Sequence, residues 1–189
     1  MNRQSELATY ETMVKDCRLC PLRDGCQQVV FGEGNPEARL MLVGEGPGAE
    51  EDRLGRPFVG AAGQLLDRIL SAGKFPRPEV YIANVVKCRP PGNRLPLPHE
   101  VRACRVHLER QIEIINPQII ICLGALATQT LIDPNARITR DRGKWARKDG
   151  RLLMPTFHPA ALLRDPAKKR PVWEDIQMVM AVYHDNGVI

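Results

Sequence analysis

The sequence predicts an α/β fold in which a parallel sheet of four strands is flanked by helices. Two observations lead to this prediction. Short apolar runs alternate along the chain with segments of helical periodicity. The runs are apolar at nearly every position and rich in β-branched residues, which is typical of parallel strands buried on both faces. With 189 residues and no internal repeat or convincing linker, the chain suits one domain, residues 1–189.

The expected elements follow in order along the chain. Four runs are predicted to be strands: residues 40–44 (LMLVG), 80–86 (VYIANVV), 118–123 (QIIICL) and 152–157 (LLMPTF). Four segments place apolar residues at helical spacing: residues 62–70, 98–115, 125–132 and 172–184. Pro98 suits the first turn of its helix, where the missing N–H is not needed. The alternation predicts right-handed crossovers between the strands.

Composition and charge indicate an intracellular globular protein. Hydrophobic residues make up 43% and charged residues 26% of the chain, and no apolar stretch approaches the ~20 residues of a membrane span. The polar N-terminus lacks the apolar core of a secretory signal, so we expect a cytoplasmic location and no membrane partner. The net charge is +5, with basic clusters at residues 87–94, 137–151 and 164–170. Such clusters suit either a polyanion-binding surface or a solvated face.

Six cysteines in an intracellular chain favour metal binding or catalysis over disulfides. Cys17 and Cys20 form a CxxC pair whose two thiolates can reach one metal. The other four are spread along the chain: Cys26, Cys88, Cys104 and Cys122. From spacing alone, a structural zinc site and no metal site at all both stay open. Cys122 lies in a predicted strand, so we expect it to be a small core residue.

Polar residues gather where the predicted strands end. The turn Gly-Glu-Gly-Pro-Gly of residues 44–48 follows the first strand and contains Glu45. Phe58 lies in the loop that comes next, Asn84 interrupts the second apolar run, and His158 follows the fourth. Each has an ordinary structural explanation by itself. Because ligands bind at the carboxyl ends of parallel strands, their convergence predicts a functional site there.

A phosphate site is the alternative that the glycine-rich turn raises. The turn lacks the Lys-Ser/Thr pair that ends a P-loop. Gly44, Gly46 and Ala49 fit the alanine-ended dinucleotide fingerprint. However, Pro47 and the acidic run at residues 50–52 suit a helix N-terminus that holds pyrophosphate poorly. The sequence therefore argues against a phosphate site.

Four motifs together resemble the family 4 uracil-DNA glycosylases, which carry an iron–sulfur cluster: GEGPGAEED, GRPFVGAAGQLL, NVVKCRPPGNR and FHPAALLR. The resemblance runs from Cys17 to Asp175. It implies a single three-layer domain with a central four-stranded parallel sheet. It also implies a monofunctional enzyme, a monomer, that flips uracil out of single- or double-stranded DNA and hydrolyses the N-glycosidic bond in base excision repair. An abasic site is the expected product.

The same resemblance implies a [4Fe–4S] cluster as cofactor. Its ligands would be four thiolates, as such clusters require: Cys17, Cys20, Cys88 and Cys104. Residues 10–30 would form the N-terminal cluster-binding segment. Cys26 lies outside this pattern but near enough to Cys20 to substitute as a ligand. The cluster would brace loops that face DNA, because the hydrolysis needs no redox step.

The resemblance also assigns the uracil-binding residues: Glu45, Gly46, Pro47, Phe58, Asn84 and His158. Phe58 would stack on the flipped base, and the Asn84 carboxamide would pair with uracil N3–H and O4. His158 and Glu45 would be the catalytic pair. His158 would donate a hydrogen bond to O2 of the departing base, and Glu45 would orient the attacking water beside a sugar that becomes positively charged.

Three further residues receive roles in selectivity and DNA binding. Glu51 would lie near uracil C5 and help to exclude the thymine methyl group. Leu162 would be an apolar wedge that fills the gap left by the flipped nucleotide, although either leucine of the Leu162–Leu163 pair could instead pack in the core. Arg164 would contact DNA phosphates.

Two other functions stay open at this level. An iron–sulfur DNA-binding protein could recognise uracil or abasic DNA without efficient turnover. A related subtype bonds covalently to the abasic sugar, but it carries a basic insertion ending in histidine after the asparagine motif. Residues 84–94 continue here without such an insertion, which argues against that subtype.

Overall fold

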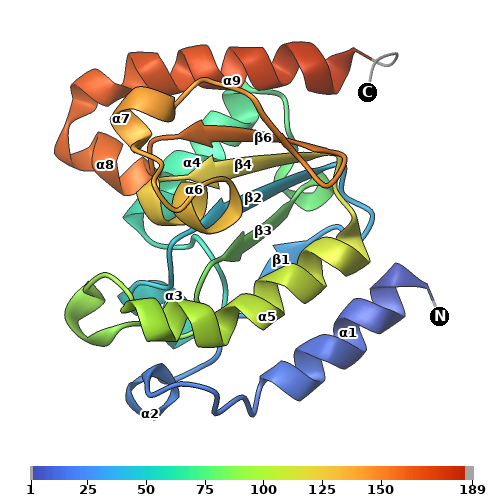
Figure 1. The fold of residues 1–189 in the computed structure, drawn as a ribbon, viewed down its shortest axis with the longest axis vertical. Coiled ribbons are helices and arrows are strands. Elements are labelled where there is room, and N and C mark those ends of the chain that lie inside the picture. The colour runs from blue at the N-terminus through green and yellow to red at the C-terminus, as the bar shows by residue number, and fades with distance from the viewer. Residues whose placement is uncertain (1, 186–189) are drawn as a thin grey trace.

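The computed structural model describes residues 2–185 and contains one mixed six-stranded sheet, in the order β1-β3-β2-β4-β6-β5 (Figure 1). The strands are β1 (Glu33–Gly34), β2 (Leu40–Gly44), β3 (Tyr81–Asn84), β4 (Ile119–Leu123), β5 (Ala146–Lys148) and β6 (Arg151–Thr156). The four central strands, β3, β2, β4 and β6, pair in parallel. They are the four strands predicted from the sequence, so the predicted fold class is confirmed.

The two edge strands were not predicted. β1 pairs antiparallel with β3, and β5 pairs antiparallel with β6. They are two and three residues long and contain no fully buried residue, so they carry no apolar run. β3 is also shorter than expected, because residues 85 and 86 leave the strand. Their amides instead donate to the carbonyls of Gly44 (2.9 Å) and Glu45 (3.1 Å), which fixes the turn after β2 against the end of β3.

Nine α-helices are present in the described part of the chain: α1 (Arg3–Val14), α2 (Leu22–Gly25), α3 (Ala49–Leu54), α4 (Ala61–Ala72), α5 (Pro98–Ile115), α6 (Ala125–Leu131), α7 (Ile138–Asp141), α8 (Pro159–Arg164) and α9 (Lys169–His184). Three 3₁₀ helices accompany them: η1 (Arg77–Glu79), η2 (Pro91–Asn93) and η3 (Pro166–Lys168). The predicted helices correspond to α4, α5, α6 and α9. No helix among residues 2–185 combines the length and the apolar character needed to cross a membrane.

Helices cover both faces of the sheet and produce three layers. On one face, α1, α5 and α6 pack on residues such as Met41 and Val43 of β2. On the other face, α4, α8 and α9 pack on Leu40 and Leu42 of the same strand. Figure 1 shows α1 lying beside α5 and α9 running along the opposite side of the molecule. Because β2 is buried on both faces, polar side chains are confined to its end, where the GEGPG turn begins.

Candidate active site

A cavity of about 690 Å³ opens where β2, β3 and β6 end. Its lining includes all but one of the residues predicted to bind the base, catalyse or contact DNA: Glu45, Gly46, Pro47, Glu51, Phe58, Asn84, His158 and Arg164. The missing residue is Leu162. The predicted convergence of these side chains at the carboxyl edge of the sheet is therefore confirmed, while their individual roles stay predictions.

Gly44 allows three segments to meet at the back of this cavity. A Cβ atom on Gly44 would lie 2.5 Å from Asn84 Oδ1 and 2.5 Å from the tip of the Phe58 ring. Real Cβ atoms do not approach other atoms so closely, so a larger residue would displace Asn84 or Phe58. The first glycine of the turn thus serves the packing of the site.

Asn84 ends β3 and is only 2% exposed. Its side-chain Oδ1 is buried and has no hydrogen-bond partner. Buried acceptors are almost always paired, and an unpaired one costs free energy, so this atom needs a functional explanation. Because Asn84 lines the cavity, this oxygen is placed to accept a hydrogen bond from a molecule bound there.

Phe58 follows α3 and has a positive φ of 52°, which bulky residues rarely adopt. The side chain is 5% exposed. Its ring centroid lies 5.5 Å from that of His158, with 28° between the planes. The first turn of α4 packs directly on the Phe58 backbone, since a Cβ on Gly63 would lie 2.0 Å from the Phe58 carbonyl carbon. The ring therefore forms a wall of the cavity, with α4 packed behind its backbone.

His158 is the N-cap of α8, and its ring nitrogens have different roles. Nδ1 accepts a hydrogen bond from the backbone amide of Ala160 at 3.1 Å. In the neutral ring the proton must then reside on Nε2. Burial, with a smaller contribution from the positive charge of the nearby Arg164, lowers the pKa of His158 to about 4. At neutral pH, His158 is thus an uncharged donor through Nε2.

Glu45 and Arg164 carry opposite charges and both line the cavity. Burial raises the pKa of the Glu45 carboxyl, and the Coulomb attraction of Arg164 partly opposes that rise. A carboxylate with a raised pKa accepts a proton more readily than an exposed one. The cavity therefore combines a basic carboxylate, a neutral imidazole donor, a carboxamide and an aromatic wall.

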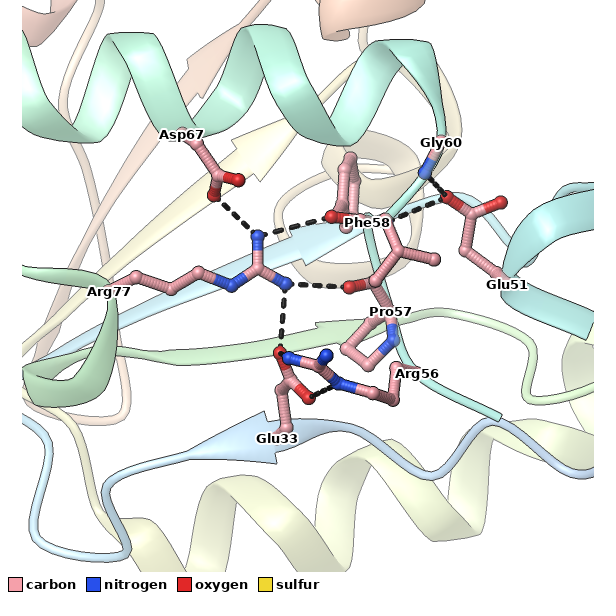
Figure 2. Close-up of polar contacts among 9 residues, drawn as sticks. Glu33, Glu51, Arg56, Pro57, Phe58, Gly60, Asp67 and Arg77 are labelled. Atoms are coloured by element: carbon pink, nitrogen blue, oxygen red, sulfur yellow. Dashed lines mark hydrogen bonds and ion pairs between the residues drawn. The ribbon is translucent and has the colours of Figure 1, made fainter. Parts of the chain in front are cut away.

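Glu51, on α3, connects two loops of the site. Its Oε1 accepts hydrogen bonds from the amides of Val59 (2.9 Å) and Gly60 (2.8 Å), as Figure 2 shows. Its Oε2 accepts from the amide of Gly48 at 3.2 Å. These contacts fix the carboxylate between the GEGPG turn and the Phe58 loop. Exclusion of a thymine methyl group by Glu51 stays a prediction.

The assignment of the DNA wedge to Leu162 requires correction. Leu162 is 2% exposed and packs in the core beneath α8, so it is not available at the surface in this structure. Leu163 is 47% exposed. Consecutive residues of a helix point in different directions, and the helix phase of α8 could not be read from six residues. The available apolar side chain is therefore Leu163.

The four cysteines predicted as cluster ligands line one pocket of about 10 Å³, together with Lys87 and His107. They are Cys17, Cys20, Cys88 and Cys104. Burial raises the pKa of Cys88, and the adjacent Cys26 raises it further. Among residues 2–185, no three His, Cys, Asp or Glu side chains surround one point as the ligands of a single ion do. Cys122 is fully buried in β4, as expected of a core residue.

Two buried residues that the sequence interpretation missed lie behind the site. Lys87 Nζ donates to the backbone carbonyl of Asn84 (2.8 Å) and to Gln111 Oε1 (2.5 Å). Asp52 Oδ1 accepts from the amides of Gln27 (2.8 Å) and Gln28 (3.2 Å), which ties α3 to the N-terminal segment. The position of Lys87 directly before Cys88 could have indicated a buried role for this lysine. No pattern in the sequence indicates the contacts of Asp52.

Comparison with known proteins agrees with this arrangement. Residues 31–177 match the family model of the uracil DNA glycosylase superfamily. A type-4 uracil-DNA glycosylase of Thermotoga maritima is 46% identical over 191 residues, covering 98% of each chain. The chain belongs to the type-4 uracil-DNA glycosylase family. A second type-4 relative, from Pyrobaculum aerophilum, is 43% identical over 92% of each chain.

A type-5 uracil-DNA glycosylase of Thermus thermophilus is more distant, at 31% identity over 75% of this chain and 81% of the relative. The type-4 relatives are similar over nearly the whole length, including the N-terminal segment with the CxxC pair. Both the site and the cysteine pocket of this type-4 family member therefore lie within the shared region.

The protonation state of His158 can be tested by an NMR titration of the ¹⁵N-labelled imidazole. We expect a neutral ring protonated at Nε2 down to about pH 5, because burial holds the pKa at about 4. In the urea-unfolded chain the histidines should titrate near ~6.5. Since the folded pKa is the lower one, His158 should reduce stability as the pH falls from ~6.5 towards 4. A folded His158 that charges near pH 6.5 would contradict the assignment.

Proposed function

We propose that the chain is a monofunctional uracil-DNA glycosylase that extrudes uracil from DNA and hydrolyses the N-glycosidic bond, leaving an abasic site. The observation that carries this proposal is the buried, unpaired Oδ1 of Asn84 in a cavity with a neutral His158 donor. The names of the type-4 relatives support it. An intracellular monomer acting on uracil-containing DNA is part of the same proposal.

Base recognition follows from the two ends of the Asn84 carboxamide. Oδ1 would accept a hydrogen bond from uracil N3–H, and Nδ2 would donate to uracil O4. Cytosine offers an acceptor at N3 and a donor at N4, so it would meet the carboxamide with both positions mismatched. The Phe58 ring would stack on the extruded base. Hydrogen bonding of the Asn84 carbonyl to Lys87 supports this geometry by fixing the backbone.

Bond cleavage would use His158 and Glu45 on opposite sides of the breaking bond. As the bond from C1′ to N1 breaks, its electron pair moves onto uracil and charge develops at O2. The Nε2–H of His158 would donate a hydrogen bond to that oxygen. Glu45 would stabilise the positively charged sugar and orient a water molecule, accepting its proton as the oxygen bonds to C1′. The uracil anion then takes a proton from solvent.

DNA binding would involve α8, which extends from His158 at the edge of the cavity. Leu163 is the exposed apolar side chain that could enter the base stack after extrusion, at a cost offset by the extra contacts. Arg164, next to it, would contact a phosphate. Glu51 would border uracil C5, where its carboxylate, already fixed by three amides, could not move aside for a methyl group.

We also propose that the protein holds a [4Fe–4S] cluster, with four cysteines as its ligands: Cys17, Cys20, Cys88 and Cys104. Four thiols and no carboxylate in one pocket match the donors that such a cluster requires. A cluster is larger than a single ion, so thiolates that hold it would lie further apart than the ligands of one ion. When bound, the cluster would act as a structural brace, joining the N-terminal segment, the segment after β3 and helix α5.

Excision is tested with a single-uracil oligonucleotide, followed by alkali cleavage and by detection of the free base. We expect strand breaks at the uracil position and released uracil, with a matched thymine oligonucleotide left intact. Binding of the uracil oligonucleotide without release of uracil would overturn the enzymatic proposal and favour the non-catalytic DNA-binding alternative.

Asn84→Asp tests base recognition. The change removes the Nδ2 donor and places a carboxylate beside uracil O4. We expect kcat/KM for uracil excision to fall by about 5- to 150-fold, because an unpaired buried polar group costs about 1–3 kcal/mol. Asn135→Asp makes the same chemical change at an exposed position and should leave activity intact. Normal uracil excision by Asn84→Asp would refute the role of the carboxamide.

The cluster is tested by iron and sulfide analysis of protein purified without oxygen. We expect bound iron and absorption near ~400 nm. Cys104→Ala should lose iron and unfold at a lower temperature. Cys122→Ala, at another buried cysteine, should retain the iron. A colourless protein loaded with zinc would show that the cluster assignment is wrong.

A further inference from the structure

The loop of residues 57–60, which carries Phe58, is held by a positive charge on one side and a negative charge on the other (Figure 2). The Arg77 guanidinium donates to the carbonyls of Pro57 (2.7 Å) and Phe58 (3.1 Å). The Glu51 carboxylate accepts from the amides of the next two residues, Val59 and Gly60. Four successive backbone positions are thus fixed by two side chains.

Arg77 is itself anchored to two other elements. Its guanidinium contacts Asp67 Oδ1 on α4 at 2.6 Å and Glu33 Oε1 on β1 at 2.9 Å. Burial of the Arg77 side chain, which is 22% exposed, reduces solvent screening of these contacts. The planar guanidinium has five N–H donors in fixed directions, so it can hold carbonyls and carboxylates at the same time. Arg77 therefore connects the loop to β1 at the edge of the sheet and to α4.

Phe58 needs such a restraint because its backbone conformation is unfavourable. A φ of 52° persists for a bulky residue only when its surroundings enforce it. Without the contacts to its carbonyl and to that of Pro57, the loop could relax towards negative φ. The ring would then leave its place beside Asn84 and His158.

We propose that Arg77 is a positioning residue that sets the plane of the Phe58 ring and thereby the affinity of the cavity for an extruded base. This inference rests on the proposed function, since it assumes that Phe58 stacks on that base. Arg77 does not line the cavity, so it would act only through the loop.

Arg77→Met is the informative variant, because it frees the loop carbonyls while neither acidic partner of Arg77 is left buried and unpaired. Glu33 keeps both of its hydrogen bonds to Arg56 (2.7 and 3.0 Å), and Asp67 is half exposed and can be hydrated. We therefore expect the variant to fold. We expect kcat/KM for uracil excision to fall by about 100-fold, the loss typical of a misplacement of ~1 Å.

A double-mutant cycle with Phe58→Ala separates positioning from general destabilisation. If Arg77 acts through the ring, Arg77→Met should reduce kcat/KM by less than about 3-fold in the Phe58→Ala background. A full additional loss there would overturn the proposal.

Binding measurements give a second readout. The probe is an oligonucleotide with one 2′-fluoro-deoxyuridine, whose glycosidic bond is hydrolysed slowly, compared with a thymidine oligonucleotide. Arg77→Met should weaken binding to the uracil probe by about 5- to 150-fold, the range for stacking of one base, and leave thymidine binding unchanged. Equal weakening of both would contradict a role in base positioning.

Arg56→Met is the matched control, because the Arg56 side chain binds the same Glu33 and its hydrogen bonds go to that residue rather than to the loop carbonyls. It should retain wild-type kcat/KM. If the wild type excises uracil and Arg77→Met behaves like Arg56→Met, the inference about Arg77 fails while the proposed function stands. If the wild type does not excise uracil, the proposed function itself fails.

Discussion

The close approach of three segments at Gly44 is the constraint on which the site depends. The end of β2, the Asn84 side chain and the Phe58 ring occupy space that any Cβ on Gly44 would enter. The parallel pairing of β2 with β3 places Gly44 opposite Asn84, and the amides after β3 bind the carbonyls of Gly44 and Glu45. The acidic turn, the carboxamide and the aromatic wall are therefore packed against one another at a single point.

The cysteine pocket and the active-site cavity share the backbone that leaves β3. Lys87 donates its side-chain ammonium to the Asn84 carbonyl and its backbone amide to Cys104 Sγ at 3.3 Å. Asp52 ties the helix after the GEGPG turn to residues next to Cys26. A rearrangement in the cysteine pocket would therefore be transmitted to Asn84 through buried hydrogen bonds. A structural brace in that pocket would stabilise the proposed base recognition without taking part in the chemistry.

The local pattern of apolar residues was sufficient to predict the four central strands. It also placed Glu45, Asn84 and His158 at the ends of these strands, where the cavity lies. The strands buried on both faces and the amphipathic helices α4 and α5 have strong apolar patterns. α1 has none, since Leu7 and Val14 are its only buried residues. β1 exists only through pairing with the distant β3, and β5 is a short, largely exposed arm of a hairpin with β6. Arg77 was also missed, because its contacts lie 10 to 44 residues away in sequence. Such roles depend on tertiary packing, which periodicity does not report.

The charges of the cavity are arranged for a reaction that separates charge. Arg164 favours the ionised form of Glu45 and disfavours the protonated form of His158. In the proposed reaction, Arg164 would thus help to keep Glu45 ionised on the side where the sugar becomes positive. It would also add to the effect of burial that keeps His158 a neutral donor on the side where the base becomes negative. Arg164 lies at the end of α8, and His158 caps its beginning. If a DNA phosphate neutralises Arg164, binding of DNA would change the pKa of both Glu45 and His158. The six-residue helix α8 would then link DNA binding to the ionisation of these two side chains.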